Sequence, residues 1–135
     1  MEEVCFFKEF SEFFFSVDGV TLAPTVLVDV TASDSVMQEE IFGPVVVVVP
    51  FDDEEEGIAI ANSTEFGLYD YVFSQDSDRA YKIARQLRSG NVGINSAQRN
   101  HEAPFGGFKM SGVGRDGGDF GMLCYTEMQS IIWPG

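Results

Sequence analysis

The run Val45–Pro50, "VVVVVP", places the strongest constraint on the fold of this chain. Its five consecutive valines lack the alternation of apolar and polar side chains that marks a strand with one wet face. Such a run is typical of a parallel strand that is covered on both faces. Parallel strands need long crossover connections, so the neighbouring sequence is expected to alternate between strands and helices.

A helix is predicted directly after this strand, in "FDDEEEGIAIANST". Asp52 or Asp53 is the expected cap, and the acidic first turn complements the positive end of the helix dipole. The run of acidic residues therefore indicates a helix start and not a metal site.

A second helix is predicted in "DRAYKIARQLRSG", with Asp76 or Ser77 as its cap and Gly90 as its C-terminal stop. One face of this helix is apolar and is expected to face the core: Ala80, Ile83, Ala84 and Leu87.

Further strands are predicted at Thr25–Val30, Tyr71–Gln75 and Asn91–Asn95. The middle of the chain then follows a β-α-β-α-β order, which implies parallel strands with right-handed crossovers. The fold class is α/β, built on this short parallel unit. A single helical turn is expected in "SDSVMQEEIFGP", where Gly43-Pro44 ends it.

The two ends of the chain differ from this middle. Residues 1–19 are rich in phenylalanine, and the spacing of Phe6, Phe7, Phe10, Phe13 and Phe14 predicts an amphipathic helix. Residues 20–135 are expected to form one partial domain. Its long glycine-rich loop (96–118) precedes "GDFGMLC", a poor helix former, and a strand predicted at Tyr125–Trp133.

Charge and cysteine content exclude several classes of function. Twenty-two acidic against eight basic residues give a net charge of −14, which repels nucleic acid and anionic lipid. Two cysteines are too few for a disulfide framework, and the start has no basic region typical of a signal peptide. No apolar run reaches the ~20 residues of a membrane span. A cytoplasmic protein without nucleic-acid or membrane partners is expected.

The hexapeptide "GVGRDG" (112–117) has the spacing of a dinucleotide-binding fingerprint. A true fingerprint follows a buried strand and opens a helix, whereas this one follows loop sequence and precedes a poor helix former. A tight, positively charged turn is the better interpretation. The only histidine, His101, lies in a polar loop with no cysteine near it, so no metal site is predicted.

Four segments together resemble the C-terminal part of the NAD(P)-dependent aldehyde dehydrogenases, from about Leu22 to Ile132. They are "PTVLVDV", "QEEIFGPVVVVVPFDDEEEGIAIANST", "GLYDYVFSQDSDRAYKIARQLRSGNVGIN" and "APFGGFKMSGVGRDGG…YTEMQSI". The combination of "EEIFGP" with "PFGGFKMSGVGR" at the right distance is the most specific part. The N-terminus is unrelated to the family.

The resemblance implies a set of site residues. Glu40 corresponds to the acid that contacts the nicotinamide-side ribose, and Phe42 to the aromatic residue beside the nicotinamide, so NAD or NADP is the implied cofactor. Asn95 and the loop Ser96–Pro104 are expected to border the aldehyde tunnel, with Phe105 in its wall. The stretch Gly106–Gly114 is expected to hold that loop in place.

The resemblance also implies that residues 20–135 are part of the family's catalytic domain. It implies that the final segment, "YTEMQSIIW", is an oligomerisation strand, which in the family adds to the edge of a sheet in the neighbouring subunit.

The resemblance also shows what this sequence lacks. The family's nucleophilic-cysteine segment, general-base glutamate and cofactor domain have no counterpart, and neither Cys5 nor Cys124 matches the nucleophile. No catalytic residue is therefore assigned. The first hypothesis is an aldehyde dehydrogenase segment that is inactive alone. The alternatives are an interaction module that pairs with a full-length aldehyde dehydrogenase subunit or with itself, and a remnant without function.

Overall fold

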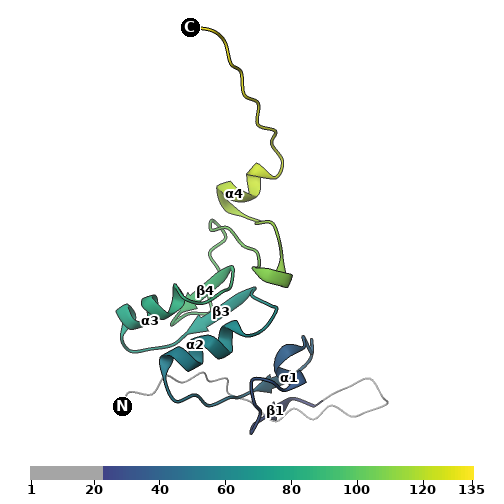
Figure 1. Ribbon diagram of the computed structural model, residues 1–135, viewed down its shortest axis with the longest axis vertical. Helices are drawn as coiled ribbons and strands as arrows, with labels where there is room; N and C mark the ends of the chain where they lie inside the picture. Colours follow the sequence, from purple (N-terminus) through teal and green to yellow (C-terminus); the bar gives the residue numbers. More distant parts are fainter. Residues whose placement is uncertain (1–22) are drawn as a thin grey trace, which may run out of the picture.

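The computed structural model describes residues 23–135, and the helix predicted within residues 1–19 lies outside this range. The described part contains two pairs of parallel strands, with helices between them (Figure 1). Strand β1 (Thr25–Leu27) pairs with β2 (Val45–Val47), and β3 (Tyr69–Val72) pairs with β4 (Asn91–Ile94). The predicted α/β class with parallel strands is confirmed.

Helices connect the strands of each pair. The single turn α1 (Ser35–Gln38) lies between β1 and β2, and α3 (Ser77–Ala84) lies between β3 and β4. Helix α2 (Glu54–Asn62) links the two pairs. After β4 come a 3-10 turn, η1 (Lys109–Ser111), and the short helix α4 (Gly118–Leu123).

Both predicted helix caps are confirmed. The Asp53 carboxylate accepts a hydrogen bond from the Glu56 backbone N–H at 2.9 Å. The Asp76 Oδ1 atom accepts from the backbone N–H groups of Asp78 and Arg79, each at 3.0 Å. These carboxylates satisfy N–H groups that have no partner inside the helix, which explains why each helix begins where it does.

The β-α-β-α-β order predicted for the middle of the chain is present as β2, α2, β3, α3 and β4, but the parallel pairing implied between its first two strands is wrong. Within residues 23–135, β2 pairs only with β1, and β3 only with β4. The valine run forms a strand of three residues, and Val48 is 44% exposed. Complete burial of a strand needs a wider sheet with layers on both faces, and a two-stranded sheet offers neither.

The core lies between the β3–β4 pair and α3. Val72, Ala80 and Ile83 are buried, and Val72 is only 1% exposed. Partly buried apolar side chains surround these three: Ile58, Ala84, Leu87, Val92 and Ile94. The apolar face predicted for α3 is thereby confirmed.

Gly90 does not end α3, contrary to the prediction. The helix ends at Ala84 with Arg85 as its cap residue. Gly90 instead lies where two backbone segments meet: its N–H donates to the Gly67 carbonyl at 3.0 Å, and a Cβ atom there would overlap the Gly106 carbonyl. Close backbone approach is the reason for glycine at this position.

The C-terminal region also departs from expectation. Residues 118–123 form the short helix α4, although "GDFGMLC" is a poor helix former. The strand predicted at Tyr125–Trp133 is absent from the described chain, where the segment is extended, exposed and projects away from the rest (Figure 1). A strand needs neighbouring backbone to pair with, and no segment within 23–135 lies alongside this one.

No helix in the described part of the chain is long and apolar enough to cross a membrane.

Candidate functional site

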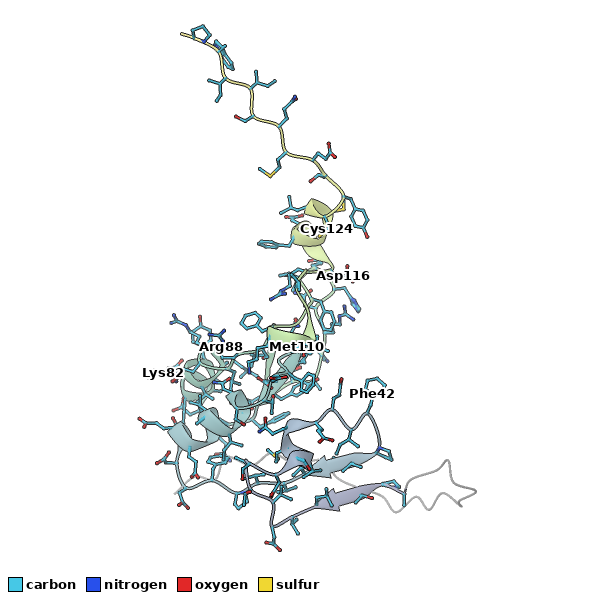
Figure 2. The ribbon with its side chains drawn as sticks, turned by 45° about the vertical axis from the view of Figure 1, so that its right-hand side comes forward. Phe42, Lys82, Arg88, Met110, Asp116 and Cys124 are labelled. Carbon is cyan, nitrogen blue, oxygen red and sulfur yellow. The ribbon has the colours of Figure 1, made fainter. Side chains whose placement is uncertain are left out.

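Glu40 and Phe42 lie in the loop between α1 and β2. The Glu40 side chain is exposed, and Phe42 is 93% exposed. Phe42 has a φ of 53°, in the left-handed region that bulky residues rarely adopt. Figure 2 shows its ring at the tip of the loop, pointing away from the strands.

Asn95 follows β4 directly and holds the ends of two strands together. Its Oδ1 atom accepts from the Ser74 N–H at 2.9 Å, and its Nδ2 atom donates to the Ser74 carbonyl at 2.8 Å. Its φ is 51°, a left-handed value that asparagine tolerates better than most residues. The side-chain amide therefore positions the start of the loop predicted to border the aldehyde tunnel.

Phe105 closes the other end of this loop. It forms an antiparallel bridge with Asp116, with both backbone N–H···O distances at 2.6 Å. The Arg99 guanidinium lies 3.7 Å from the centre of the Phe105 ring, in a cation–π contact. In the middle of the loop, the Tyr69 hydroxyl donates to the Gln98 carbonyl at 3.3 Å. The loop is thus held at three points.

The glycine-rich stretch after Phe105 packs against the β3 side of the molecule. The Gly67 N–H donates to the Ser111 hydroxyl oxygen at 3.0 Å, and the Phe108 N–H donates to the Gly67 carbonyl at 2.8 Å. The Lys109 ammonium donates to the carbonyls of Asn62 and Thr64 at 3.0 and 2.9 Å, at the C-terminal end of α2. A cation there also complements the negative end of the helix dipole.

"GVGRDG" forms a turn around the Arg115 guanidinium. The Arg115 Nη1 atom donates to the carbonyls of Gly107 and Gly114 at 3.0 and 2.7 Å. Helix α4 does follow the motif, which differs from the prediction, but η1 and not a strand precedes it. The motif therefore lacks the strand–loop–helix geometry that holds a pyrophosphate.

The structure does not bring the four predicted site residues together. Glu40 and Phe42 belong to the half of the molecule with β1 and β2, whereas Asn95 and Phe105 belong to the half with β3 and β4. Cys124 is exposed at the end of α4, and Figure 2 draws it on a separate part of the molecule from Phe42. Residues 23–135 contain no cluster of three side chains suited to a metal ion.

Asp70 and Asn62 are not among the residues predicted from the sequence. Asp70 is an acidic residue inside strand β3, and the aromatic and apolar residues around it in the sequence could have indicated that it is buried. Asn62 joins α2 to the segment after α3: its Nδ2 atom donates to the Gln86 carbonyl at 2.9 Å, and its Oδ1 atom accepts from the Arg88 N–H at 2.7 Å. Nothing in the local sequence of Asn62 indicates this long-range role.

Burial raises the pKa of the Asp70 carboxyl, while the Ser89 hydroxyl and the positive charge of Lys109 act in the opposite direction. A carboxyl whose pKa is higher in the folded chain than in the unfolded one favours folding in its protonated form. Its contribution to stability is therefore largest below the unfolded pKa and is lost as the pH rises through the folded pKa.

The variant Asp70→Asn is expected to melt on the order of 3 °C above the parent chain at pH 7, because the amide carries no charge to desolvate. The difference should shrink as the pH falls towards 3. Thermal melts followed by circular dichroism across this pH range test the prediction. Glu127→Gln, on the exposed tail, changes the net charge equally and should leave the melting temperature unchanged.

Comparison with known protein families matches residues 15–131 to the aldehyde dehydrogenase family. The chain belongs to this family. An aldehyde dehydrogenase of Mycobacterium tuberculosis, solved in complex with NAD⁺, superposes with a TM-score of 0.82 at 40% identity, covering 88% of this chain and 26% of that one. The NAD⁺ complex of an aldehyde dehydrogenase from Bacillus cereus gives a TM-score of 0.78 at 44% identity, covering 84% and 23%.

The match is to only a part of each relative. A relative from Staphylococcus saprophyticus is 45% identical over 113 residues, which are 84% of this chain and 24% of that protein. This aldehyde dehydrogenase family chain thus spans about a quarter of the length of the relatives it matches.

Proposed function

We propose that this chain is the C-terminal part of an NAD(P)-dependent aldehyde dehydrogenase and supplies two faces of its active site. Glu40 and Phe42 form the nicotinamide-side face, and Asn95 and Phe105 form the aldehyde-side face. In the family, such a site oxidises an aldehyde to a carboxylic acid. The chain takes part in this reaction only together with protein that carries the catalytic cysteine, the general base and the rest of the cofactor site.

The conformation of Phe42 is the observation that carries this proposal. Four described residues other than glycine have a positive φ, and two of them, Phe42 and Asn95, are predicted site residues. Such backbone conformations cost about 1–3 kcal/mol and are typically kept at functional sites. The hydrogen bonds to Ser74 explain the conformation of Asn95, whereas the Phe42 ring is 93% exposed and no hydrogen bond or ring contact within residues 23–135 explains its conformation. The exposed Phe42 ring is therefore suited to contact a molecule other than this chain.

Glu40 has the chemistry needed at a ribose. A carboxylate offers two acceptor oxygens and can bind both ribose hydroxyls. One charge-assisted group contributes about 1.5–3 kcal/mol, whereas association costs several. The exposed Glu40 carboxylate is accordingly expected to assist a cofactor held by other protein, and the chain alone is expected to bind NAD weakly.

We assign neither the hydride acceptor nor the nucleophile of the reaction to the residues that the structure describes. When bound, NAD or NADP supplies the hydride acceptor. The exposed Cys124 has its sulfur 4.0 Å from the Arg115 carbonyl oxygen, with no basic side chain hydrogen-bonded to it among residues 23–135. A nucleophilic thiol needs an adjacent base, and the described surroundings of Cys124 provide none.

A second candidate is an interaction module that pairs with a full-length aldehyde dehydrogenase subunit. The exposed segment Tyr125–Trp133 favours this candidate, because an extended segment with apolar side chains readily adds to the edge of a sheet. This module would act through its tail and would not need Glu40 or Phe42.

Complementation distinguishes the two candidates. We expect NADH production when the chain is co-purified with a family member whose matching C-terminal part has been removed. Glu40→Gln should lower this activity about 10- to 100-fold, which corresponds to the loss of one charge-assisted contact. Glu39→Gln, the neighbouring exposed acid, should leave it unchanged. A purified pair that makes no NADH, or one equally active with either variant, contradicts the proposed function.

A further inference from the structure

A mostly apolar cavity of about 250 Å³ lies between β3, α2 and α3. Val72 and Ile83, two of the three buried apolar side chains among residues 23–135, form part of its wall. The small core of the described chain therefore borders an empty space. Unfilled apolar space of this kind lowers stability, because the atoms that line it lack contacts on one side.

The wall of the cavity is suited to an apolar side chain. The α2 residues in it are spaced as one helical face, and two of them are small: Glu54, Gly57, Ile58 and Ala61. Both acidic residues of the wall have a cationic neighbour, since Glu54 forms an ion pair with Arg79 and the charge of Lys109 acts on Asp70.

The sequence contains an apolar segment that could fill this space. We call "FFKEFSEFF" (6–14) the phenylalanine segment, because five of its nine residues are phenylalanine. Their spacing predicts one apolar helical face, with Lys8, Glu9 and Glu12 on the opposite face. So short a helix is marginal in water and needs a surface on which to bury its apolar face.

The phenylalanine segment does not belong to what this chain shares with the aldehyde dehydrogenases. The family match covers residues 15–131 and so begins after this segment. A role for the segment must therefore come from the chemistry of this chain itself.

The connection from the described part is long enough to reach the cavity. Thr25 of β1 pairs with Val45, and Phe51 in the cavity wall is six residues beyond Val45, a span of at most about 22 Å. The nine residue steps from Phe14 to Ala23 span up to about 30 Å when extended. Figure 1 shows α2 between β3 and the part of the molecule that holds β1.

We propose that the phenylalanine segment docks on its own chain and places the Phe10 ring in the cavity between β3, α2 and α3. The contact completes the core from within one molecule. It uses none of the four residues assigned to the proposed function, so either proposal can fail without the other.

The cavity size and the charge of the chain both favour this occupant. An engineered apolar cavity of about 150 Å³ takes up benzene, so a cavity of about 250 Å³ has room for one phenyl ring. Phe10 is the middle one of the five phenylalanines, which leaves a pair on each side to cover the rim. A segment of the same chain has a high effective concentration at the cavity, whereas two copies with a net charge of −14 each repel one another.

Thermal melts of the full chain test the docking. Phe10→Ser is expected to lower the melting temperature by about 5–10 °C, because one phenylalanine loses its burial. Phe15→Ser makes the same exchange outside the predicted apolar face and should leave the melting temperature within about 1 °C of the parent. Far-ultraviolet circular dichroism verifies that both variants are folded.

A double-mutant cycle connects Phe10 to the cavity. Ala61→Gln places a polar side chain in the wall and should also lower the melting temperature. Combined with Phe10→Ser, it should add little, because both substitutions disrupt the same contact. Ala59→Gln lies on an exposed part of α2 outside the cavity lining, and its effect should add fully to that of Phe10→Ser.

Cross-linking gives a direct measurement of the contact. A photoreactive phenylalanine at position 10 of the full chain should cross-link, within one chain, to peptides that contain residues 51–61 or 69–72. The same group at position 15 should not.

Three results would overturn the proposal. Equal melting temperatures of Phe10→Ser and Phe15→Ser would show that Phe10 is not buried. Fully additive effects of Phe10→Ser and Ala61→Gln would place Phe10 outside the cavity. Cross-links from position 10 that miss these peptides, or that reach them only between two copies, would exclude docking within one chain.

Discussion

Replacing Gly90 by alanine is expected to destabilise the chain by at least about 3 kcal/mol. The new Cβ would overlap the Gly106 carbonyl, which belongs to the backbone and has no alternative rotamer. Overpacking against side chains typically costs 1–3 kcal/mol, and a rigid backbone group relaxes less. The substitution should also break the hydrogen bond from Gly90 to Gly67 and so loosen the glycine-rich loop from β3.

Urea unfolding followed by circular dichroism measures this effect, with Gly114→Ala as the matched control. A Cβ atom at Gly114 would meet no atom within 4 Å, so this variant should stay within about 0.5 kcal/mol of the parent. Equal stabilities of the two alanine variants would show that the segments around Gly90 and Gly106 do not pack as described.

Asn95→Ala is expected to lower the free energy of unfolding by about 2–3 kcal/mol. It removes both hydrogen bonds to Ser74, each contributing about 1 kcal/mol, and places alanine at a φ of 51°. A left-handed conformation adds about 1–2 kcal/mol for a residue with a Cβ atom. The segment after β3 would then lose its side-chain link to the end of β4, and the loop to Phe105 would lose its fixed start.

Asn95→Gly separates the two causes. Glycine also lacks the side-chain amide but adopts a positive φ without strain. The Asn95→Gly variant should therefore lose less folding stability than the Asn95→Ala variant. Chemical denaturation of both variants gives the comparison. A fully stable Asn95→Ala variant would mean that the asparagine does not hold the strand ends.

The elements predicted correctly depend on local chemistry. Asp53 and Asp76 cap their helices through backbone groups two or three residues away, so a short stretch of sequence contains the whole interaction. The apolar face of α3 has the same character, because helical periodicity alone determines which side chains share a face.

The errors concern contacts between distant segments. Whether β2 and β3 become neighbours depends on the whole sheet and not on "VVVVVP" or "YVFSQ". Gly90 has the position of a helix stop in the sequence, but its partner Gly106 is 16 residues further on. The tail has the composition of a strand, yet strand formation requires a pairing partner, which residues 23–135 do not supply.

The candidate site residues come from the family resemblance alone and stay a prediction. Glu40 and Phe42 are exposed residues in a loop, and their composition and spacing contain no mark of a cofactor site. The structure adds the positive φ of Phe42, which is a property of the backbone, and the two hydrogen bonds from the Asn95 side-chain amide to Ser74. Asp70 and Asn62 escaped prediction because burial and long-range hydrogen bonds define them.

The most direct test of the account is an assay of the chain by itself. With NAD or NADP and a panel of aliphatic and aromatic aldehydes, the chain should produce no NADH or NADPH above a protein-free control. Covalent catalysis needs a thiol activated by an adjacent base, and no basic side chain within residues 23–135 hydrogen-bonds to the exposed Cys124. Sustained NADH production that disappears in the Cys124→Ala variant would contradict the account.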